Sequence, residues 1–315
     1  MPEFSIVIPL YNKERDIVKT LNSVFLQTIT DFEIVIVNDG STDDSEAMVK
    51  TVEDSRILLF SKENEGVART RNYGVSKATS AHIVFLDADD YWHPNHLENL
   101  KNLIEKFPEH KWYATAYEKK HNHKLITSML SPVMQQPKGW LGSIDNYFEN
   151  SLMDALAWTS AVCFKKPFFE ALGGFDASIT HGAGEDTDLW IRAALKAPLA
   201  FSNTITARHN LDGSNRISNT PTLTRNYMNT ETYVAAAKKD PFLKKYLDRN
   251  SYSFAIQHKM ANDIPSFKNY LENIDVNNLT TRQRFLLKQP RSVLKLLVKG
   301  KDFAEKLGVR LTAFK

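Results

Sequence analysis

Short apolar runs alternate with helical patterns along residues 4–107, and this alternation constrains the fold more than any other feature. The apolar runs are residues 4–8, 33–37, 56–60 and 82–86, and the last is almost unbroken, as in a strand covered on both faces. Apolar residues at three- and four-residue spacing lie between them and predict helices. We therefore predict an α/β fold, with a mainly parallel central sheet flanked by helices and ligands beyond the carboxyl ends of its strands.

The pattern changes from residue 111 onward. Strand-like segments lie at 112–117, 124–130, 160–164 and 205–209, and a helical pattern lies at 186–196. His121, Asn122 and His123 form a polar turn between the first two segments, so we interpret them as a hairpin and not as metal ligands. After Pro221 the pattern is helical to the end. We predict a first domain over residues 1–220 and a helical extension over residues 221–315, basic at its end.

Composition indicates a globular protein, with 42% hydrophobic and 24% charged residues. Cys163 is the one cysteine, and its apolar neighbours indicate a buried structural thiol. The N-terminus lacks the charge and apolar pattern of a signal peptide, and no apolar run approaches the ~20 residues of a spanning helix. We therefore expect a cytoplasmic protein.

The strongest chemical signal is the run Asp87-Ala88-Asp89-Asp90, directly after the buried strand at 82–86. Carboxylates at the end of such a strand face the ligand crevice. Aspartates one residue apart can share a divalent cation and the diphosphate bound to it. The alternative is a solvated acidic loop before the helix that starts near Pro94. Taken alone, an Asp-x-Asp pattern favours that alternative.

Two further strand ends carry polar groups suited to a nucleotide. Residues 38–43 follow the second strand and include Asp39, while residues 9–12 and Glu14 follow the first. They offer a carboxylate for a base N–H, an aromatic ring for the base face and a further acid. Turn and cap chemistry could explain each of them separately. It does not explain why all of them are expected at one edge of the sheet.

Together these segments resemble the family 2 glycosyltransferases, which have the GT-A fold. The resemblance extends over residues 4–215, and its motifs occur in the order of the family. The matching segments are residues 5–12, 37–43, 64–66, 71–72, 85–90, 173–176 and 184–190. It implies a GT-A-like nucleotide-binding domain over residues 1–220.

The resemblance implies roles for individual residues. The donor nucleotide would be bound by Pro9, Tyr11, Glu14, Asp39, Arg71, Asp87 and Ala88. Asp39 would read the edge of uracil or another base, and Arg71 would approach the ribose or diphosphate. Asp87 would contact the ribose or a water near the metal. Asp89 would ligate Mn²⁺ or Mg²⁺, with His209 as a second metal candidate, although a lone histidine is more often a loop residue.

The pair Glu185-Asp186 is the second chemical centre. A general base must reach the acceptor hydroxyl on the face of the sugar opposite the leaving diphosphate. Gly182 and Gly184 precede the pair and allow unusual backbone angles. Acids in the first turn of an amphipathic helix are also ordinary dipole partners. The resemblance implies that Asp186 is the base, with Glu185 as its neighbour or substitute.

The function implied is inverting, metal-dependent transfer of a hexosyl or N-acetylhexosaminyl group. The donor would be a nucleotide-diphosphate sugar, UDP-linked by the resemblance, and the acceptor a hydroxyl of a glycan or lipid-linked glycan. The resemblance points to bacterial surface polysaccharide or glycolipid synthesis. One alternative is a nucleotidyltransferase, but those enzymes usually carry a Gly-rich loop at the position of residues 9–13, which contain no glycine here. The other alternative is a catalytically silent nucleotide-binding scaffold.

Charge is concentrated in the tail. Residues 282–315 hold ten Lys or Arg and two acids, a net charge of +8, while the preceding residues carry −5. Within residues 284–300 basic and apolar residues interleave at helical spacing, interrupted at Pro290. This pattern predicts either a helix on the anionic inner face of a membrane or one that docks on the first domain. It offers no aromatic interleaving for nucleic acid.

Overall fold

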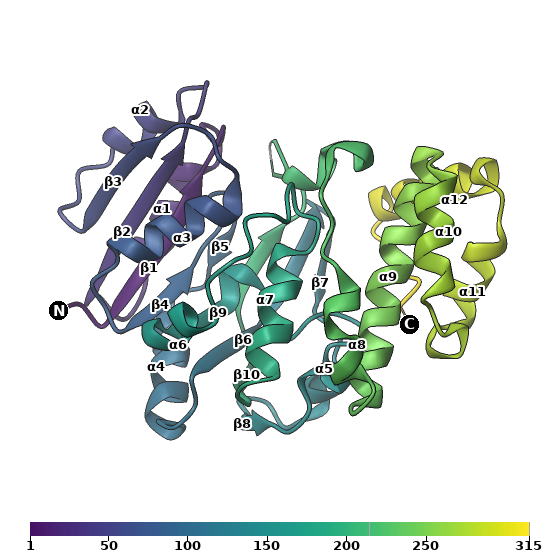
Figure 1. The fold of residues 1–315 in the computed structure, drawn as a ribbon. Coiled ribbons are helices and arrows are strands. Elements are labelled where there is room, and N and C mark those ends of the chain that lie inside the picture. Colours follow the sequence, from purple (N-terminus) through teal and green to yellow (C-terminus); the bar gives the residue numbers. More distant parts are fainter. Residues whose placement is uncertain (214, 315) are drawn as a thin grey trace.

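The computed structural model describes residues 1–213 and 215–314, which form a mixed, mostly parallel sheet flanked by helices (Figure 1). The strands are β1 (Phe4–Leu10), β2 (Phe32–Asp39), β3 (Ile57–Lys62), β4 (His82–Phe85), β5 (Tyr91–Trp92), β6 (Trp112–Asn122), β7 (Leu125–Ser128), β8 (Leu141–Ile144), β9 (Val162–Lys165) and β10 (Leu199–Asn210). The helices are α1 (Ile17–Phe25), α2 (Ser45–Lys50), α3 (Val67–Lys77), α4 (His96–Lys106), α5 (Tyr147–Asn150), α6 (Lys166–Ala171), α7 (Glu185–Ala194), α8 (Val234–Ala237), α9 (Pro241–Ala261), α10 (Ile264–Glu272), α11 (Thr281–Lys288) and α12 (Arg291–Lys306).

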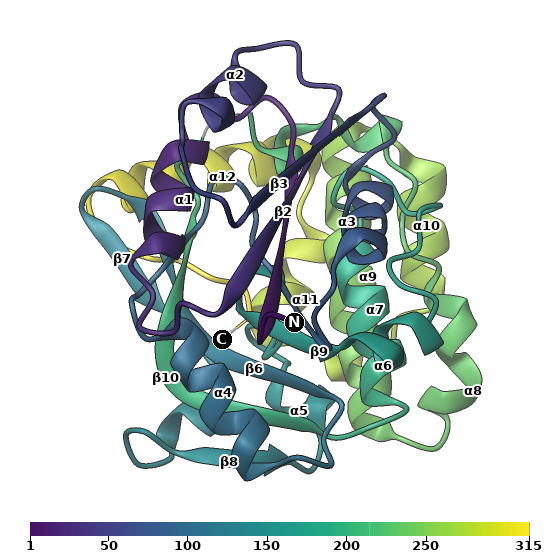
Figure 2. The same cartoon turned by 90° about the vertical axis from the view of Figure 1, so that its left-hand side faces the viewer.

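Four parallel strands form the half of the sheet that the sequence predicts, in the order β3-β2-β1-β4. The cores of β1, β2 and β4 are buried because helices cover both faces, with α1 on one side and α3 on the other (Figure 2). The predicted α/β fold with a flanked, mainly parallel sheet is therefore confirmed.

The other half of the sheet changes direction. β9 pairs antiparallel with both β4 and β6, and β6 then runs parallel to β10. β6 and β7 form a hairpin whose turn follows Asn122, which confirms the hairpin predicted there. Cys163 lies in β9 and is buried, as predicted. Burial alone raises the pKa of its thiol, so it is a poor nucleophile.

The C-terminal helices share the core of the α/β part. Met228, Leu243 and Phe254 belong to the main cluster of buried apolar side chains, and a smaller cluster joins α9 to α11 through Tyr252 and Leu287. The domain boundary near residue 220 stays a prediction, but buried contacts cross it. Among the described residues, no helix is long and apolar enough to cross a membrane.

Candidate active site

The loops after β1 and β2 are joined by hydrogen bonds beyond the carboxyl ends of these paired strands. The backbone N–H of Asn12 donates to Ser41 Oγ at 3.1 Å, and the N–H of Thr42 donates to Asn12 Oδ1 at 2.8 Å. Asn12 has φ 50°, a conformation that asparagine tolerates better than most residues. The expected convergence of the first two strand ends is thus present.

Three of the predicted nucleoside contacts lie on or near these loops. Glu14 Oε2 accepts a hydrogen bond from the N–H of Asp44 at 3.1 Å, so this carboxylate holds the second loop. Tyr11 is 41% exposed and can offer its ring to a ligand. Pro9 is half-buried in β1, where it pairs with Val37. Their contacts with a nucleotide stay predictions.

Asp39 organises the segment that follows β3. Its buried carboxylate accepts hydrogen bonds from Lys62 Nζ at 2.5 Å, from the N–H of Glu65 at 3.0 Å and from the N–H of Gly66 at 2.9 Å. A carboxylate has about four acceptor positions. One acceptor position therefore remains on the carboxylate of Asp39, which is 3% exposed, and its contact with a base stays a prediction.

Arg71 connects the two acidic motifs. It lies on α3 and is 4% exposed, with Nη2 2.6 Å from Asp87 Oδ1 and Nη1 3.8 Å from Glu185 Oε1. Burial opposes the charged form, but attraction by Asp87 and Glu185 outweighs it and raises the pKa of the guanidinium. Nε and Nη1 are buried without a hydrogen-bond partner among the described residues, and Nη1 faces Glu185.

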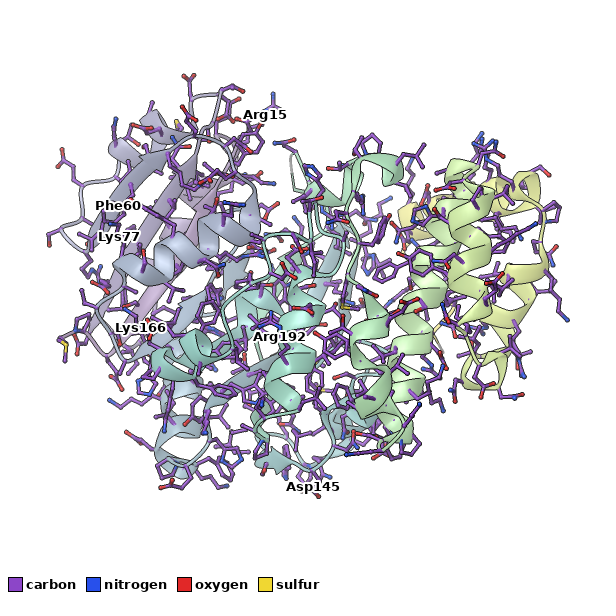
Figure 3. All side chains as sticks on the ribbon, in the orientation of Figure 1. Arg15, Phe60, Lys77, Asp145, Lys166 and Arg192 are labelled. Carbon is purple, nitrogen blue, oxygen red and sulfur yellow. The ribbon has the colours of Figure 1, made fainter. Side chains whose placement is uncertain are left out.

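Asn72 joins α3 to the segment at 173–176. Its amide exchanges two hydrogen bonds with the backbone of Phe175, at 2.8 and 2.9 Å, and the Phe175 ring lies 5.1 Å from the Arg71 guanidinium. Gly174 has φ 68°, and a Cβ there would come within 2.6 Å of Asn72 Oδ1. Arg192, labelled on α7 in Figure 3, donates to the carbonyls of Leu172 and Gly174 at 2.6 and 2.9 Å. The motif at 173–176 therefore shapes the site through its backbone.

The turn after β4 buries Asp89 in large part, leaving its side chain 15% exposed, and buries Asp90 almost completely. Asp89 Oδ2 lies 2.6 Å from Lys13 Nζ, yet burial raises the pKa of the Asp89 carboxyl despite that lysine. Asp90 is 2% exposed and accepts from Ser160 Oγ at 2.7 Å and from the N–H of Asn210 at 3.0 Å. Burial, then repulsion by Asp89, raises the pKa of Asp90 well above its usual range. Ala88 is buried and its carbonyl accepts from Thr20, which fixes the turn.

The residues predicted to hold a metal carry oxygen and nitrogen atoms that suit a divalent cation. They do not form a ready-made cluster of ligands. One oxygen each of Asp87 and Asp89 is occupied, by Arg71 and Lys13 respectively. His209 stacks on Trp158 at 4.8 Å, and burial, then Arg216, lowers the pKa of its imidazole to about 3, so it is neutral. No group of three or more potential ligands exists within residues 1–213 and 215–314. Mg²⁺ bound to a diphosphate needs only one or two protein carboxylates, which the remaining oxygens can supply.

Glu185 and Asp186 open α7 and point to different surroundings. Gly184 caps the helix with φ 106°, where a side chain would be strained. Glu185 is 5% exposed, and burial, then the charge of Asp186, raises its pKa to about 7. Asp186 is half-buried, and its Oδ1 accepts from the N–H of Thr187 at 2.6 Å. Asp186 is thus the more accessible carboxylate, and Glu185 faces Arg71.

The raised pKa of Glu185 predicts a pH dependence of stability. Between about pH 4.5 and about pH 7 the folded protein holds a proton that the unfolded chain releases, so this group's contribution to the free energy of unfolding falls as pH rises. Glu185→Gln removes that contribution. As pH rises through this interval, we expect the free energy of unfolding of Glu185→Gln to increase relative to that of the wild type. Urea unfolding at several pH values measures both free energies. A constant difference across the interval would contradict this prediction.

A match to a family model identifies the family to which this chain belongs. Residues 5–165, slightly more than half of the chain, match the model of glycosyl transferase family 2. The chain belongs to this family. The match contains the ends of β1, β2 and β4 with Asp39, Arg71 and Asp89, while α7 with Asp186 lies beyond it.

Relatives of this family 2 chain align with it over different lengths. A glycosyltransferase of Rickettsia felis is 30% identical over 254 residues, which cover 77% of this chain and 38% of that protein. A glycosyltransferase of Rickettsia bellii is 42% identical over 103 residues, covering 32% of this chain and 15% of that protein. GlyA of Streptococcus pneumoniae is 37% identical over 106 residues, covering 33% and 15% respectively. The aligned parts are thus well under half the length of these relatives.

A solved structure matches almost the whole fold. Residues 1–349 of S. aureus TarS, in complex with UDP-GlcNAc, align with a TM-score of 0.67 and 17% identity, covering 95% of this chain and 92% of that one. At that identity the likeness shows the fold alone. It confirms the GT-A-like fold predicted from the resemblance, including helices that follow the α/β part.

Two contributors to the site were missed by sequence reasoning. Lys13 pairs with Asp89 across 76 positions of the sequence, and Ser160 donates to Asp90 across 70. Both are common surface residue types outside any motif, and their role depends on which loops fold together. The sequence carried no signal for Ser160. For Lys13 the sequence did carry a signal, because it lies just after the end of the first strand, where ligand-binding residues are expected.

Proposed function

We propose that this chain transfers a sugar from a UDP-sugar to an acceptor hydroxyl, with inversion at the anomeric carbon. The observation that carries the proposal is the Arg71 bridge, because one buried cation pairs with Asp87 of the donor motif and faces Glu185 of the acceptor motif. Both motifs therefore belong to one site. The UDP-GlcNAc bound by S. aureus TarS supports a UDP-sugar as donor.

In the proposed reaction Asp186 removes the proton from the acceptor hydroxyl as that oxygen attacks the anomeric carbon. The bond to the diphosphate breaks in the same step, so no covalent enzyme intermediate is needed. Asp39, Tyr11 and Pro9 would bind the nucleoside, and the unpartnered N–H groups of Arg71 would face the diphosphate or ribose. Glu185 would hold Arg71 in place and remain the substitute base.

A divalent cation, Mn²⁺ or Mg²⁺, is part of the proposal. Asp89 would ligate it, with His209 as a second candidate and Asp87 contacting the ribose or a water near the ion, and the ion would neutralise the leaving nucleoside diphosphate. Lys13 would have to share or release Asp89 Oδ2. Once released, its ammonium lies close enough to the same turn to attract the diphosphate.

The acceptor is proposed to be a glycan or lipid-linked glycan, as in bacterial surface polysaccharide or glycolipid synthesis. A hexose or N-acetylhexosamine is the proposed transferred sugar. Family membership leaves no reason to retain the nucleotidyltransferase alternative. An experiment distinguishes a catalytically silent nucleotide-binding protein, because such a protein would bind a UDP-sugar without transferring the sugar and without releasing UDP.

Calorimetric titration with UDP, GDP and dTDP, each with and without Mn²⁺, tests the donor site. We expect UDP to bind, to bind more tightly with Mn²⁺, and to lose at least about tenfold in affinity in Asp89→Ala, which is about 1.4 kcal/mol. Asp145→Ala is the matched control, since Asp145 is exposed and lies at the opposite end of the molecule (Figure 3). Folded protein that binds none of the three nucleotides would contradict the donor-site assignment.

A further inference from the structure

The outward face of α12 carries a stripe of exposed apolar side chains. Leu296, Phe303 and Leu307 are 69%, 63% and 64% exposed. They are spaced by seven and four positions, and Leu307 caps the C-terminus of α12, so the three continue one face of the helix. We call these three residues the α12 stripe. Large apolar side chains that share a face and remain exposed mark an interaction surface.

The opposite face of α12 attaches the helix to the rest of the molecule. Leu294 is 3% exposed, Asn122 Nδ2 donates to the carbonyl of Glu305 at 2.9 Å, and Glu305 Oε1 lies 3.7 Å from His121 Nδ1. Docking on the α/β part therefore uses a different face from the α12 stripe. The two alternatives left open by the tail sequence are not exclusive, because docking leaves the stripe uncovered.

Lysines lie beside the stripe. Lys295, Lys299 and Lys306 are exposed and make no ion pair within residues 1–213 and 215–314. Their spacing places them together on one flank of the α12 stripe. The tail from residue 282 carries a net charge of +8 while the preceding chain carries −5, so positive charge is concentrated here. An apolar stripe with a basic flank is complementary to an anionic lipid surface, where lysine stems extend along the acyl boundary.

We propose that α12 binds the surface of a bilayer containing anionic lipids, with the α12 stripe inserted at the headgroup boundary and the flanking lysines at the phosphates. This inference does not rest on the proposed function. It differs from the sequence expectation for residues 284–300, where Leu287 and Leu294 prove buried and Pro290 separates two helices. The contact surface moves toward the end of α12.

The attachment of α12 relates this surface to the site. Asn122, which holds Glu305, ends β6, and Lys120 two residues earlier lines a cavity of about 180 Å³ together with Asp89. Figure 1 shows α12 and β7 on the side of the molecule where the carboxyl ends of the parallel strands lie. Membrane-bound protein would thus hold this cavity near the bilayer, where a lipid-linked acceptor could reach it.

Cosedimentation with vesicles tests the proposal. The probes are vesicles of phosphatidylcholine with phosphatidylglycerol, and vesicles of phosphatidylcholine alone. We expect the full chain to bind the anionic vesicles at least about tenfold more tightly, with binding weakened by salt. The double variant Leu296→Ser/Phe303→Ser should lose about tenfold in binding or more, and Lys295→Glu/Lys299→Glu about fivefold or more.

Matched controls distinguish binding through the α12 stripe from non-specific binding through exposed apolar side chains or lysines elsewhere. Leu26→Ser/Leu223→Ser removes two apolar side chains that are 61% and 64% exposed elsewhere, and Lys138→Glu/Lys196→Glu reverses two exposed lysines away from α12. Both controls should bind like wild type. Equal binding to both vesicle types, stripe variants that bind normally, or a concentration-dependent dimer abolished by Phe303→Ser would overturn the proposal. The last result would identify a second copy of the chain as the occupant.

Discussion

Replacing Asp186 by asparagine is expected to lower kcat for sugar transfer by about 10²- to 10⁴-fold, the usual contribution of a general base. Asparagine keeps the shape and the hydrogen bond from the N–H of Thr187 but cannot take the acceptor proton. KM for the donor should change little, because Arg71 pairs with Asp87 and Glu185 and makes no ion pair with Asp186 within the described residues. The measurement is steady-state sugar transfer from UDP-hexose and UDP-N-acetylhexosamine donors.

Glu185→Gln is the comparison for that experiment. Glu185 is buried against Arg71, so its amide variant should alter donor binding and the pH profile more than it lowers the maximal kcat. If Glu185→Gln abolishes turnover while Asp186→Asn retains it, the base is Glu185 and the assignment within the pair is reversed. A cooperative urea unfolding transition in both variants would confirm that they remain folded.

Arg71→Met is expected to lower the free energy of unfolding by about 1–3 kcal/mol, because Asp87 loses its ion pair and the buried Glu185 must then hold a proton. The guanidinium is the cation that faces both Asp87 and Glu185, and it also lies over the Phe175 ring. Methionine retains most of the volume but none of the charge. Urea unfolding at neutral pH measures the change.

Arg69→Met is the matched control on the same helix. Arg69 has a 58% exposed side chain and pairs with Glu65 at 3.4 Å, so its loss should cost less than about 1 kcal/mol. Adding Glu185→Gln to Arg71→Met should restore part of the lost stability, since it removes one uncompensated carboxylate. Equal effects of the two arginine variants would show that the buried bridge has no special role.

The parallel half of the sheet could be predicted because its signals are local. The runs at 4–8, 33–37, 56–60 and 82–86 lie within β1 to β4 or at their edges, and the helices between them cover both faces. The antiparallel insertion of β9 between β4 and β6 could not be predicted in this way. Its pairing joins segments about eighty residues apart, and strand patterns do not specify their neighbours.

The sequence by itself determined the family, the alternation of strands and helices along residues 4–107, and the acidic motifs after the strands, because residue type and spacing are properties of the chain. The tertiary structure decided how those motifs are used. It placed Arg71 between Asp87 and Glu185 and paired Asp89 with Lys13. It also buried Glu185 and left Asp186 more accessible. It also turned the α12 stripe outward. These outcomes depend on charge partners and burial, which arise only when distant segments pack together.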